Sequence, residues 1–124
     1  MLETTLQQVI EKVDSIKPNA YDEETKTGWI NKVEGIIQKE ILHKKDEDMI
    51  VYDWGEDADT ELLVKHPYSD IYEFYLFAMI DYMNGDISFY QNSMTMFNNA
   101  FEDYSTWYKR EYGKDTGLQI TNIW

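Results

Sequence analysis

The residues that come closest to a chemical motif are the acidic and amide side chains of DYMNGDISFYQ, residues 81–91. Such a cluster around an Asn-Gly pair is typical of a calcium loop, a helix-to-helix turn or an exposed hairpin tip. An EF-hand loop has glycine at position 6 and oxygen ligands at positions 1, 3, 5 and 12. With Gly85 at position 6, those positions hold Ile80, Tyr82, Asn84 and Gln91. One ligand of the four fits, so we predict a tight turn that binds no calcium, with Asp86 capping the helix that follows.

Other patterns of catalysis or metal binding are missing from the sequence. The two histidines, His43 and His66, lack HExxH or Glu-x-x-His spacing, and the chain has no cysteine. No Gly-rich phosphate loop and no GxSxG elbow occurs. Carboxylates crowd residues 46–61, but catalytic carboxylates need a rigid pocket that separates their pKa values. We therefore expect a protein that is not an enzyme, with no catalytic residue, no cofactor and no metal site.

Composition and charge narrow the class of protein further. The 124 residues have a net charge of −13 and an aromatic fraction of 15%, which predicts one folded domain rather than a disordered chain. Between Asp46 and Asp86 there are 12 acidic residues and one basic residue, Lys65. This excludes direct nucleic-acid binding through a basic patch. A solvated acidic face is the ordinary interpretation, and steering a basic partner or mimicking DNA are the functional ones.

Neither a membrane span nor a signal peptide is apparent. No stretch reaches the roughly 20 apolar residues that a span needs, and the N-terminus lacks a basic region followed by an apolar one. We expect a soluble protein of the cytoplasm.

Helical periodicity and capping signals predict an all-α fold of about four helices in a small antiparallel bundle, residues 1–113. The first helix begins at Thr4 or Thr5, the second after Asp22 and the third at Asp70, and the fourth ends at Gly113. Gly28 and Gly35 lie on nearly the same face of the second helix. Either another helix approaches closely there, or the helix tolerates their cost.

Two segments lack helical periodicity. In residues 43–69, the runs MIVYDW and TELLVKH flank GEDAD, which is consistent with a β-hairpin with an acidic tip or with an irregular acidic segment. Residues 114–124 form a tail in which LQIT alternates at the strand period. We predict that this tail pairs with a neighbouring subunit, folding back on its own domain being the alternative.

Apolar surface on the last two helices predicts contacts between subunits. The third helix is apolar nearly all round, so we expect Phe74 and Phe77 to face a neighbour or the middle segment. Ile123 and Trp124 are the candidate contacts of the tail. The fourth helix carries two apolar stripes that we assign to packing rather than to a cofactor. They are Tyr90, Met94, Phe97, Phe101, Tyr104 and Tyr108, and Phe89, Met96, Ala100 and Trp107.

Three stretches together resemble a known group of proteins: VDSIKPNAYDEETKTGWINKVEGIIQKEI, ELLVKHPYSDIYEFYLFAMIDYMNGD and YQNSMTMFNNAFEDYSTWYKREY. The matching elements are Lys17-Pro18-Asn19-Ala20, Trp29 to Gly35, Pro67-Tyr68, Ala78 to Gly85 and Asn92 to Asn98. They are similar to head-tail connector (adaptor) proteins of tailed phages and prophages of Gram-positive bacteria. The acidic middle and the C-terminal tail depart from the resemblance.

The resemblance implies a structural component of the virion, assembled in the cytoplasm of the bacterial host. Such a protein forms a homo-oligomeric ring between the portal protein and a tail or stopper protein, without catalysis and without sequence-specific nucleic-acid binding. An acidic inner wall would repel DNA and let the genome pass. The alternative is a small acidic inhibitor, or DNA mimic, that occupies the basic groove of a nucleic-acid-binding protein.

Overall fold

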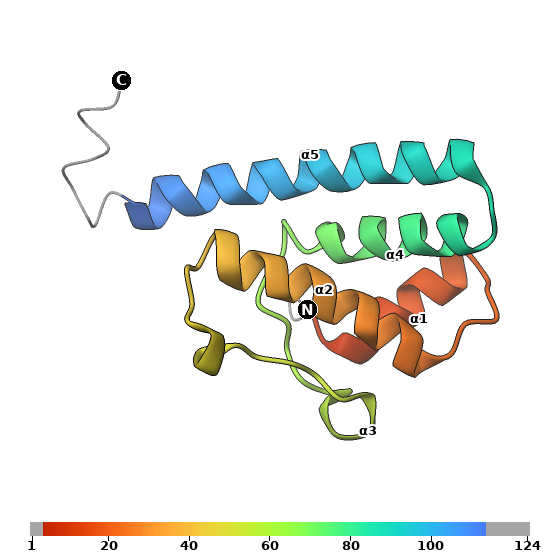
Figure 1. The fold of residues 1–124 in the computed structure, drawn as a ribbon, viewed down its shortest axis with the longest axis horizontal. Helices are drawn as coiled ribbons and strands as arrows, with labels where there is room; N and C mark the ends of the chain where they lie inside the picture. Colours follow the sequence, from red (N-terminus) through yellow and green to blue (C-terminus); the bar gives the residue numbers. More distant parts are fainter. Residues whose placement is uncertain (1–3, 114–124) are drawn as a thin grey trace.

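The computed structural model describes residues 4–113 of the chain, which contain five α-helices and one short 3-10 helix (Figure 1). The long helices are α1 (Leu6–Ile16), α2 (Glu23–Glu40), α4 (Asp70–Met83) and α5 (Ile87–Tyr112). The short elements are η1 (Asp46–Asp48) and α3 (Trp54–Asp57). Residues 4–113 contain no β-strand. The all-α fold class is therefore confirmed, and the four long helices are the four that the sequence predicts.

Local capping signals set where the first two helices begin. The Thr5 side chain accepts a hydrogen bond from the Gln8 backbone N–H at 3.2 Å, and the Gln8 side chain accepts one from the Thr5 N–H at 3.0 Å. Asp22 caps α2 by accepting from the Thr25 N–H at 2.8 Å. These bonds satisfy backbone donors that have no partner within the helix.

The turn between α4 and α5 is the predicted helix-to-helix connection. Gly85 has a φ of +78°, a left-handed conformation that glycine adopts at little cost. Its N–H donates to the Tyr82 carbonyl at 3.0 Å. The Asp86 side chain then accepts from the Phe89 N–H at 3.3 Å and caps α5. The two helices consequently run antiparallel, one along the other (Figure 1).

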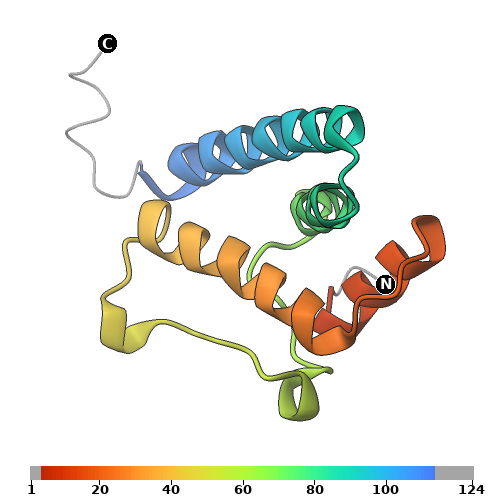
Figure 2. The ribbon, with the colours of Figure 1, turned by 45° about the vertical axis from the view of Figure 1, so that its right-hand side comes forward.

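The hydrophobic core surrounds α4, with α5 on one side and α1 and α2 on the other (Figure 2). Every residue from Ile71 to Asp81 is buried or half-buried, so helices of the same chain cover the most apolar helix. Apolar side chains that are fully buried come from α1, α2, α4 and the segment before α4, and include Leu6, Val13, Ile30, Ile37, Leu62 and Leu76.

The two predicted stripes of α5 have different outcomes. The first stripe packs along α4, and all six of its residues are buried or half-buried. In the second stripe Ala100 is buried, but Phe89 is 59% exposed and Met96 is 45% exposed. The assignment of Phe89 and Met96 to the core is therefore wrong. The reason is that α4 is the only described element in extensive contact with α5, so this flank of α5 has no helix over it.

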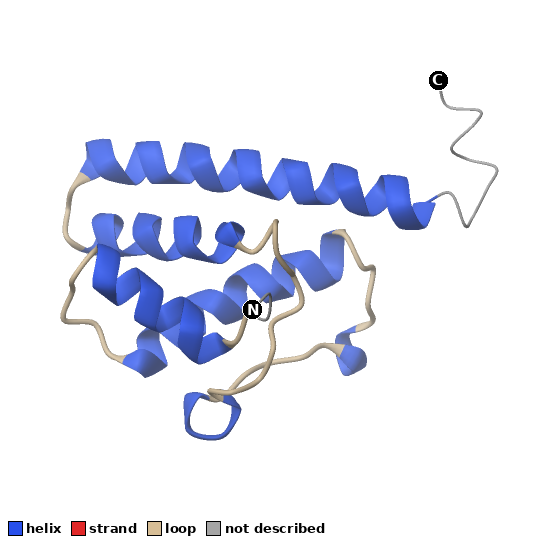
Figure 3. Cartoon of the chain, turned by 180° about the vertical axis from the view of Figure 1, so that it is seen from behind, coloured by secondary structure: helices blue, strands red, loops and turns tan. Residues whose placement is uncertain are grey.

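Residues 43–69 contain no hairpin, because each of the two apolar runs has another partner. The first run lies against α2, as described below. In the second run, Glu61 makes an isolated bridge with Thr5, and the Leu62 N–H donates to the Thr4 carbonyl at 2.8 Å. The irregular acidic segment is thus the correct alternative. The part of the segment that holds η1 and α3 crosses the side of the molecule away from α5 (Figure 3), whereas its end reaches α5, where the ring centroids of Tyr68 and Tyr104 lie 6.0 Å apart.

The two glycines inside α2 are not explained by a close helix contact. A Cβ atom on Gly28 would meet nothing within 4 Å, and one on Gly35 would lie 3.8 Å from the Met49 methyl group, an ordinary contact. Close approach of another helix is therefore the wrong alternative at Gly28, where the glycine is a tolerated cost.

Candidate interaction surfaces

Glu34 is the centre of a buried polar network between α2, α4 and the acidic segment. Its side chain is fully buried. One carboxylate oxygen accepts from the Tyr72 hydroxyl at 2.7 Å, and the other accepts from the Tyr52 hydroxyl at 2.8 Å and the Leu63 N–H at 3.0 Å. The Tyr72 hydroxyl in turn accepts from the Val64 N–H at 2.9 Å. Every donor in the network has an acceptor, as a buried polar cluster requires.

Burial favours the neutral form of each ionisable group in this network. Loss of solvent raises the pKa of Glu34, and the hydrogen bonds from Tyr72, Leu63 and Tyr52 offset part of that rise. Burial, followed by the charge of Glu34, raises the pKa of Tyr72 and Tyr52. A raised carboxyl pKa is typical of catalytic acids, but those face a cleft. Glu34 lines neither of the two surface hollows described below, and its hydrogen bonds join the three elements.

Two amide side chains of α2 hold the acidic segment by its backbone, and we call Asn31 and Gln38 the amide clamp. Asn31 accepts from the Tyr52 N–H at 2.8 Å and donates to the Tyr52 carbonyl at 3.0 Å. Gln38 does the same with Ile50, at 2.8 Å and 3.0 Å. The clamp therefore binds alternate residues of an extended run, as a neighbouring strand would.

A second polar cluster fixes the connection between α1 and α2. The buried Lys26 ammonium lies 2.7 Å from an Asp14 carboxylate oxygen and 3.2 Å from the Asn19 side-chain oxygen. Asn19 also donates to Asp14 at 2.9 Å. A buried ammonium needs such partners. Nearby, Lys17 pairs with the buried Asp81 of α4 at 2.8 Å, which ties this connection to the end of α4.

Exposed apolar side chains gather where α1 ends and α4 turns into α5, and we call Ile16, Met83, Ile87 and Phe89 the apolar end. Their exposed fractions lie between 53% and 59%. The Lys17 ammonium joins the two parts of this surface, because it binds α4 and lies 5.4 Å from the centre of the Phe89 ring. Clustered exposed apolar groups mark interaction sites on soluble proteins.

The other end of the molecule has a hollow of about 360 Å³, which we call the aromatic hollow. It lies between the last turns of α5, the residue after the end of α2 and the approach to α4. Its walls are Leu42, Leu63, Lys65, His66, Pro67, Tyr68, Tyr104, Trp107, Tyr108 and Tyr112. Burial raises the pKa of Tyr104 to about 12. The rings of Tyr68, Tyr104 and Trp107 pack against one another with centroids 5.3 to 6.0 Å apart, so the walls are preformed for an apolar group.

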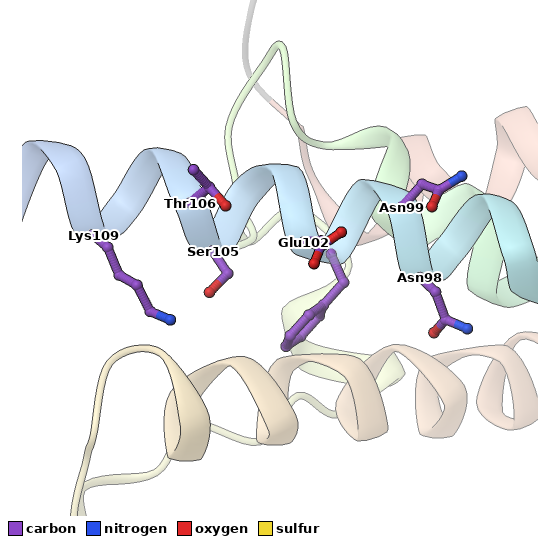
Figure 4. A pocket seen from close by; sticks show the side chains of 7 residues that line it. Asn98, Asn99, Glu102, Ser105, Thr106 and Lys109 are labelled. Carbon is purple, nitrogen blue, oxygen red and sulfur yellow. The ribbon is translucent and has the colours of Figure 1, made fainter. Parts of the chain in front are cut away.

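A second hollow, of about 460 Å³, follows the polar side of α5. Asn98, Ser105 and Lys109 point from α5 towards α2 across it, and Glu102 lies between them (Figure 4). The lining is mostly amide, hydroxyl and charged groups from one helix. It has no nucleophile paired with a base, which is what acyl or phosphoryl chemistry would need.

The residues that the sequence analysis names as candidates lie in different environments. Phe74 and Phe77 are half-buried and pack on the core of their own chain, so their part in assembly stays a prediction. Ile123 and Trp124 lie outside the described residues. His66 lines the aromatic hollow, and His43 is exposed with a φ of +56°. Within residues 4–113, no group of three or more His, Asp or Glu side chains is arranged to hold a metal ion.

Sequence reasoning missed the network of Glu34 and the amide clamp. A signal was present, because Glu34 and Gln38 fall between Ile30, Val33, Ile37 and Ile41 at helical spacing. Polar residues inside an apolar stripe are buried with it and need partners there. Their partners lie in the acidic segment, whose path has no local signal.

Comparison with protein-family models, curated proteins and solved structures found no match to this chain. Among the described helices, none is long and apolar enough to span a membrane.

Proposed function

We propose that this chain is a structural adaptor of a tailed phage or prophage, forming a closed homo-oligomeric ring between the portal and the tail or a stopper. The observation that supports this role is a pair of complementary apolar surfaces at opposite ends of one molecule. The apolar end lies at the α4–α5 turn, and the aromatic hollow lies near the far end of α5 (Figure 1). The role is mechanical and needs no catalytic residue. The protein acts in the virion and assembles in the bacterial cytoplasm.

The two surfaces fit a head-to-tail contact between identical subunits. Phe89 of the apolar end and Tyr108 of the hollow are 19 positions apart on α5, which separates the two surfaces by roughly 28 Å at 1.5 Å per residue. A patch at one place and a hollow at another make a heterologous contact, which closes into a ring when the rotation between subunits allows it. Burying exposed Phe89, Ile87 and Met83 in a hollow stabilises the joint by about 1.5–3 kcal/mol for each side chain that becomes fully buried.

The portal and the tail enter the proposal through the resemblance of the sequence to head-tail connectors. The acidic part of the segment, residues 46–61, contributes no wall to the aromatic hollow. It is therefore left free at this joint, available to face DNA or another component. A surface of this charge repels DNA, which suits a passage for the genome.

The test compares Phe89→Glu with Met96→Glu, because both side chains are exposed on α5 but only Phe89 belongs to the apolar end. Mass in solution is measured for each protein, alone and with a candidate portal protein. We expect the wild type and Met96→Glu to form the same oligomer, and Phe89→Glu to remain a folded monomer. Assembly of Phe89→Glu at the wild-type concentration would contradict the joint. A wild type that never assembles, but binds a basic nucleic-acid-binding protein one to one, would favour the acidic inhibitor instead.

A further inference from the structure

Residues 49–53 form a short extended run with one occupied backbone edge. Met49 and Asp53, at its two ends, both have extended backbone angles. Within the run, the N–H and C=O groups of Ile50 and Tyr52 all point to α2, where the amide clamp binds them. Alternate residues of an extended chain direct their backbone groups to opposite sides. The groups of Val51 therefore point away from α2.

The edge at Val51 is open. Within residues 4–113, neither the N–H nor the C=O of Val51 makes a protein hydrogen bond. Its side chain is 71% exposed, the most exposed large apolar side chain of the described part, and the neighbouring Ile50 is 38% exposed. An open strand edge with apolar side chains beside it is a template for another strand. The clamp holds the run in place, so a partner would meet an edge that is already ordered.

Charge identifies the partner that this edge fits. Residues 46–61 contain eight acidic residues and no basic one, and Asp48 and Asp53 next to the run are exposed. The same edge of a second copy, bordered by the same acidic residues, is a poor occupant because the two edges would repel each other. We infer that the Val51 edge binds an extended segment of a different protein, in which lysine or arginine alternates with apolar residues, as an added strand.

This inference does not rest on the proposed ring, because the Val51 edge belongs to neither the apolar end nor the aromatic hollow. An adaptor with such an edge would take an arm of a different virion protein, and a protein of another role could use the edge equally well.

The probe is a fluorescent peptide of sequence Lys-Val-Lys-Val-Lys, blocked at both ends, and fluorescence anisotropy measures its binding to the full chain. Val51→Pro removes the free N–H and leaves both residues of the clamp bonded, since proline accepts extended backbone before it. Val51→Thr is the matched control, because it keeps the N–H and the branched shape. We expect the peptide to bind the wild type and Val51→Thr equally, and Val51→Pro about tenfold more weakly, a loss that corresponds to one backbone hydrogen bond.

Two peptide controls protect the test against a misfolded variant and against binding by charge alone. Two methylated peptides are used, one with methyl groups on both valine nitrogens and one with a methyl group on the central lysine nitrogen. One of the two carries its methyl groups on the side that pairs with the edge, so its binding to the wild type should fall about tenfold. Replacing valine by glycine in the peptide keeps the charge and should weaken binding. The inference is overturned if the wild type does not bind the probe, if neither methylated peptide binds more weakly, or if the glycine peptide binds as well as the valine peptide.

Discussion

Glu34 shows how one buried residue can fix the path of an irregular segment. Its carboxylate joins Tyr52 and Leu63 of the acidic segment to Tyr72 of α4. A buried carboxylate is a costly way to hold such elements, because burial opposes its charge. In return its three hydrogen bonds admit one arrangement of the segment over α2, since an apolar side chain of the same size would leave the donors unpaired. We infer that the residue contributes more to specificity than to net stability.

Removing that carboxylate should therefore lower the stability of the protein strongly. Glu34→Ala leaves the hydroxyls of Tyr52 and Tyr72 and the Leu63 N–H without their acceptor, and we expect the free energy of unfolding to fall by about 3 kcal/mol. Urea unfolding measures it. Glu111→Ala, at an exposed position of α5, is the control and should change stability by less than about 0.5 kcal/mol. A loss of under about 1 kcal/mol for Glu34→Ala would mean that water replaces the carboxylate without penalty.

The raised pKa of Glu34 makes its contribution depend on pH. In the folded state burial raises the pKa above its ordinary value of 4.5, so linkage favours the folded state below pH 4.5 and this gain is lost as pH rises through the raised pKa. Glu34→Gln cannot titrate. We expect the stability of the wild type relative to Glu34→Gln to increase as pH falls from 7 towards 4.5, measured by urea unfolding at each pH. Other carboxylates titrate in both proteins and cancel, so a constant difference would show that burial leaves this pKa unshifted.

At the scale of elements, α2 serves two layers at once. Its apolar residues enter the core, while the next positions around the helix, Asn31 and Gln38, bind the acidic segment. The segment adds no regular structure of its own beyond η1 and α3. Side chains of α2 hold its first run, whereas backbone hydrogen bonds to the start of α1 and the Tyr72 hydroxyl hold its second run.

The amide clamp should control how firmly the segment is held. Replacing Asn31 and Gln38 together by leucine removes the four hydrogen bonds to Ile50 and Tyr52. We expect the amide protons of Ile50 and Tyr52 to exchange with solvent faster, with those of the core helices unchanged, because local opening costs less than global unfolding. Hydrogen exchange followed by NMR measures both. Equal acceleration in α4 would show that the substitutions destabilise the whole domain instead.

Two glycines give a matched test of backbone conformation. Gly28 is exposed inside α2 and a Cβ atom there has free space, so Gly28→Ala should raise the free energy of unfolding by about 1 kcal/mol through helix propensity. Gly85 has free space too, but its φ is +78°. Gly85→Ala should therefore lower stability by about 1 kcal/mol. Thermal or urea unfolding measures the change in stability for each substitution. If both substitutions changed stability in the same direction, the backbone conformation would not be what distinguishes the two glycines.

Helix positions were predictable from the sequence because their signals are local. Thr5 with Gln8, Asp22, and Gly85 with Asp86 each act within a few residues of a helix end. The acidic segment was not predictable, since its backbone partners Asn31 and Gln38 are 21 and 12 residues away. Whether residues 43–69 form a hairpin or follow an irregular path depended on those hydrogen bonds to Asn31 and Gln38. The exposed state of Phe89 was missed for a similar reason: a stripe at helical spacing does not tell how many helices cover it.

For the whole molecule, the position of its two apolar surfaces matters more than their size. A contact that pairs one patch with itself gives a closed dimer, whereas a patch that pairs with a hollow elsewhere can continue from copy to copy. The apolar end and the aromatic hollow are different surfaces, so the proposed assembly needs both on every subunit. A two-fold dimer of the kind described above needs one surface, whereas a ring needs both, and this difference holds for any ring size.

A mixture of two variants, each with one of the two surfaces damaged, tests whether assembly needs both surfaces. Phe89→Glu damages the apolar end and keeps the hollow, while Tyr112→Glu places a charge in the wall of the hollow and keeps the apolar end. Each variant alone should be monomeric, because every joint would bury an unpaired carboxylate. Mixed in equal amounts they can form one intact joint, between the apolar end of the Tyr112→Glu chain and the hollow of the Phe89→Glu chain, and the second joint fails. We therefore expect a mixed dimer and nothing larger, measured by sedimentation. Full assemblies in the mixture, or a dimer of either variant alone, would show that subunits do not join head to tail through these two surfaces.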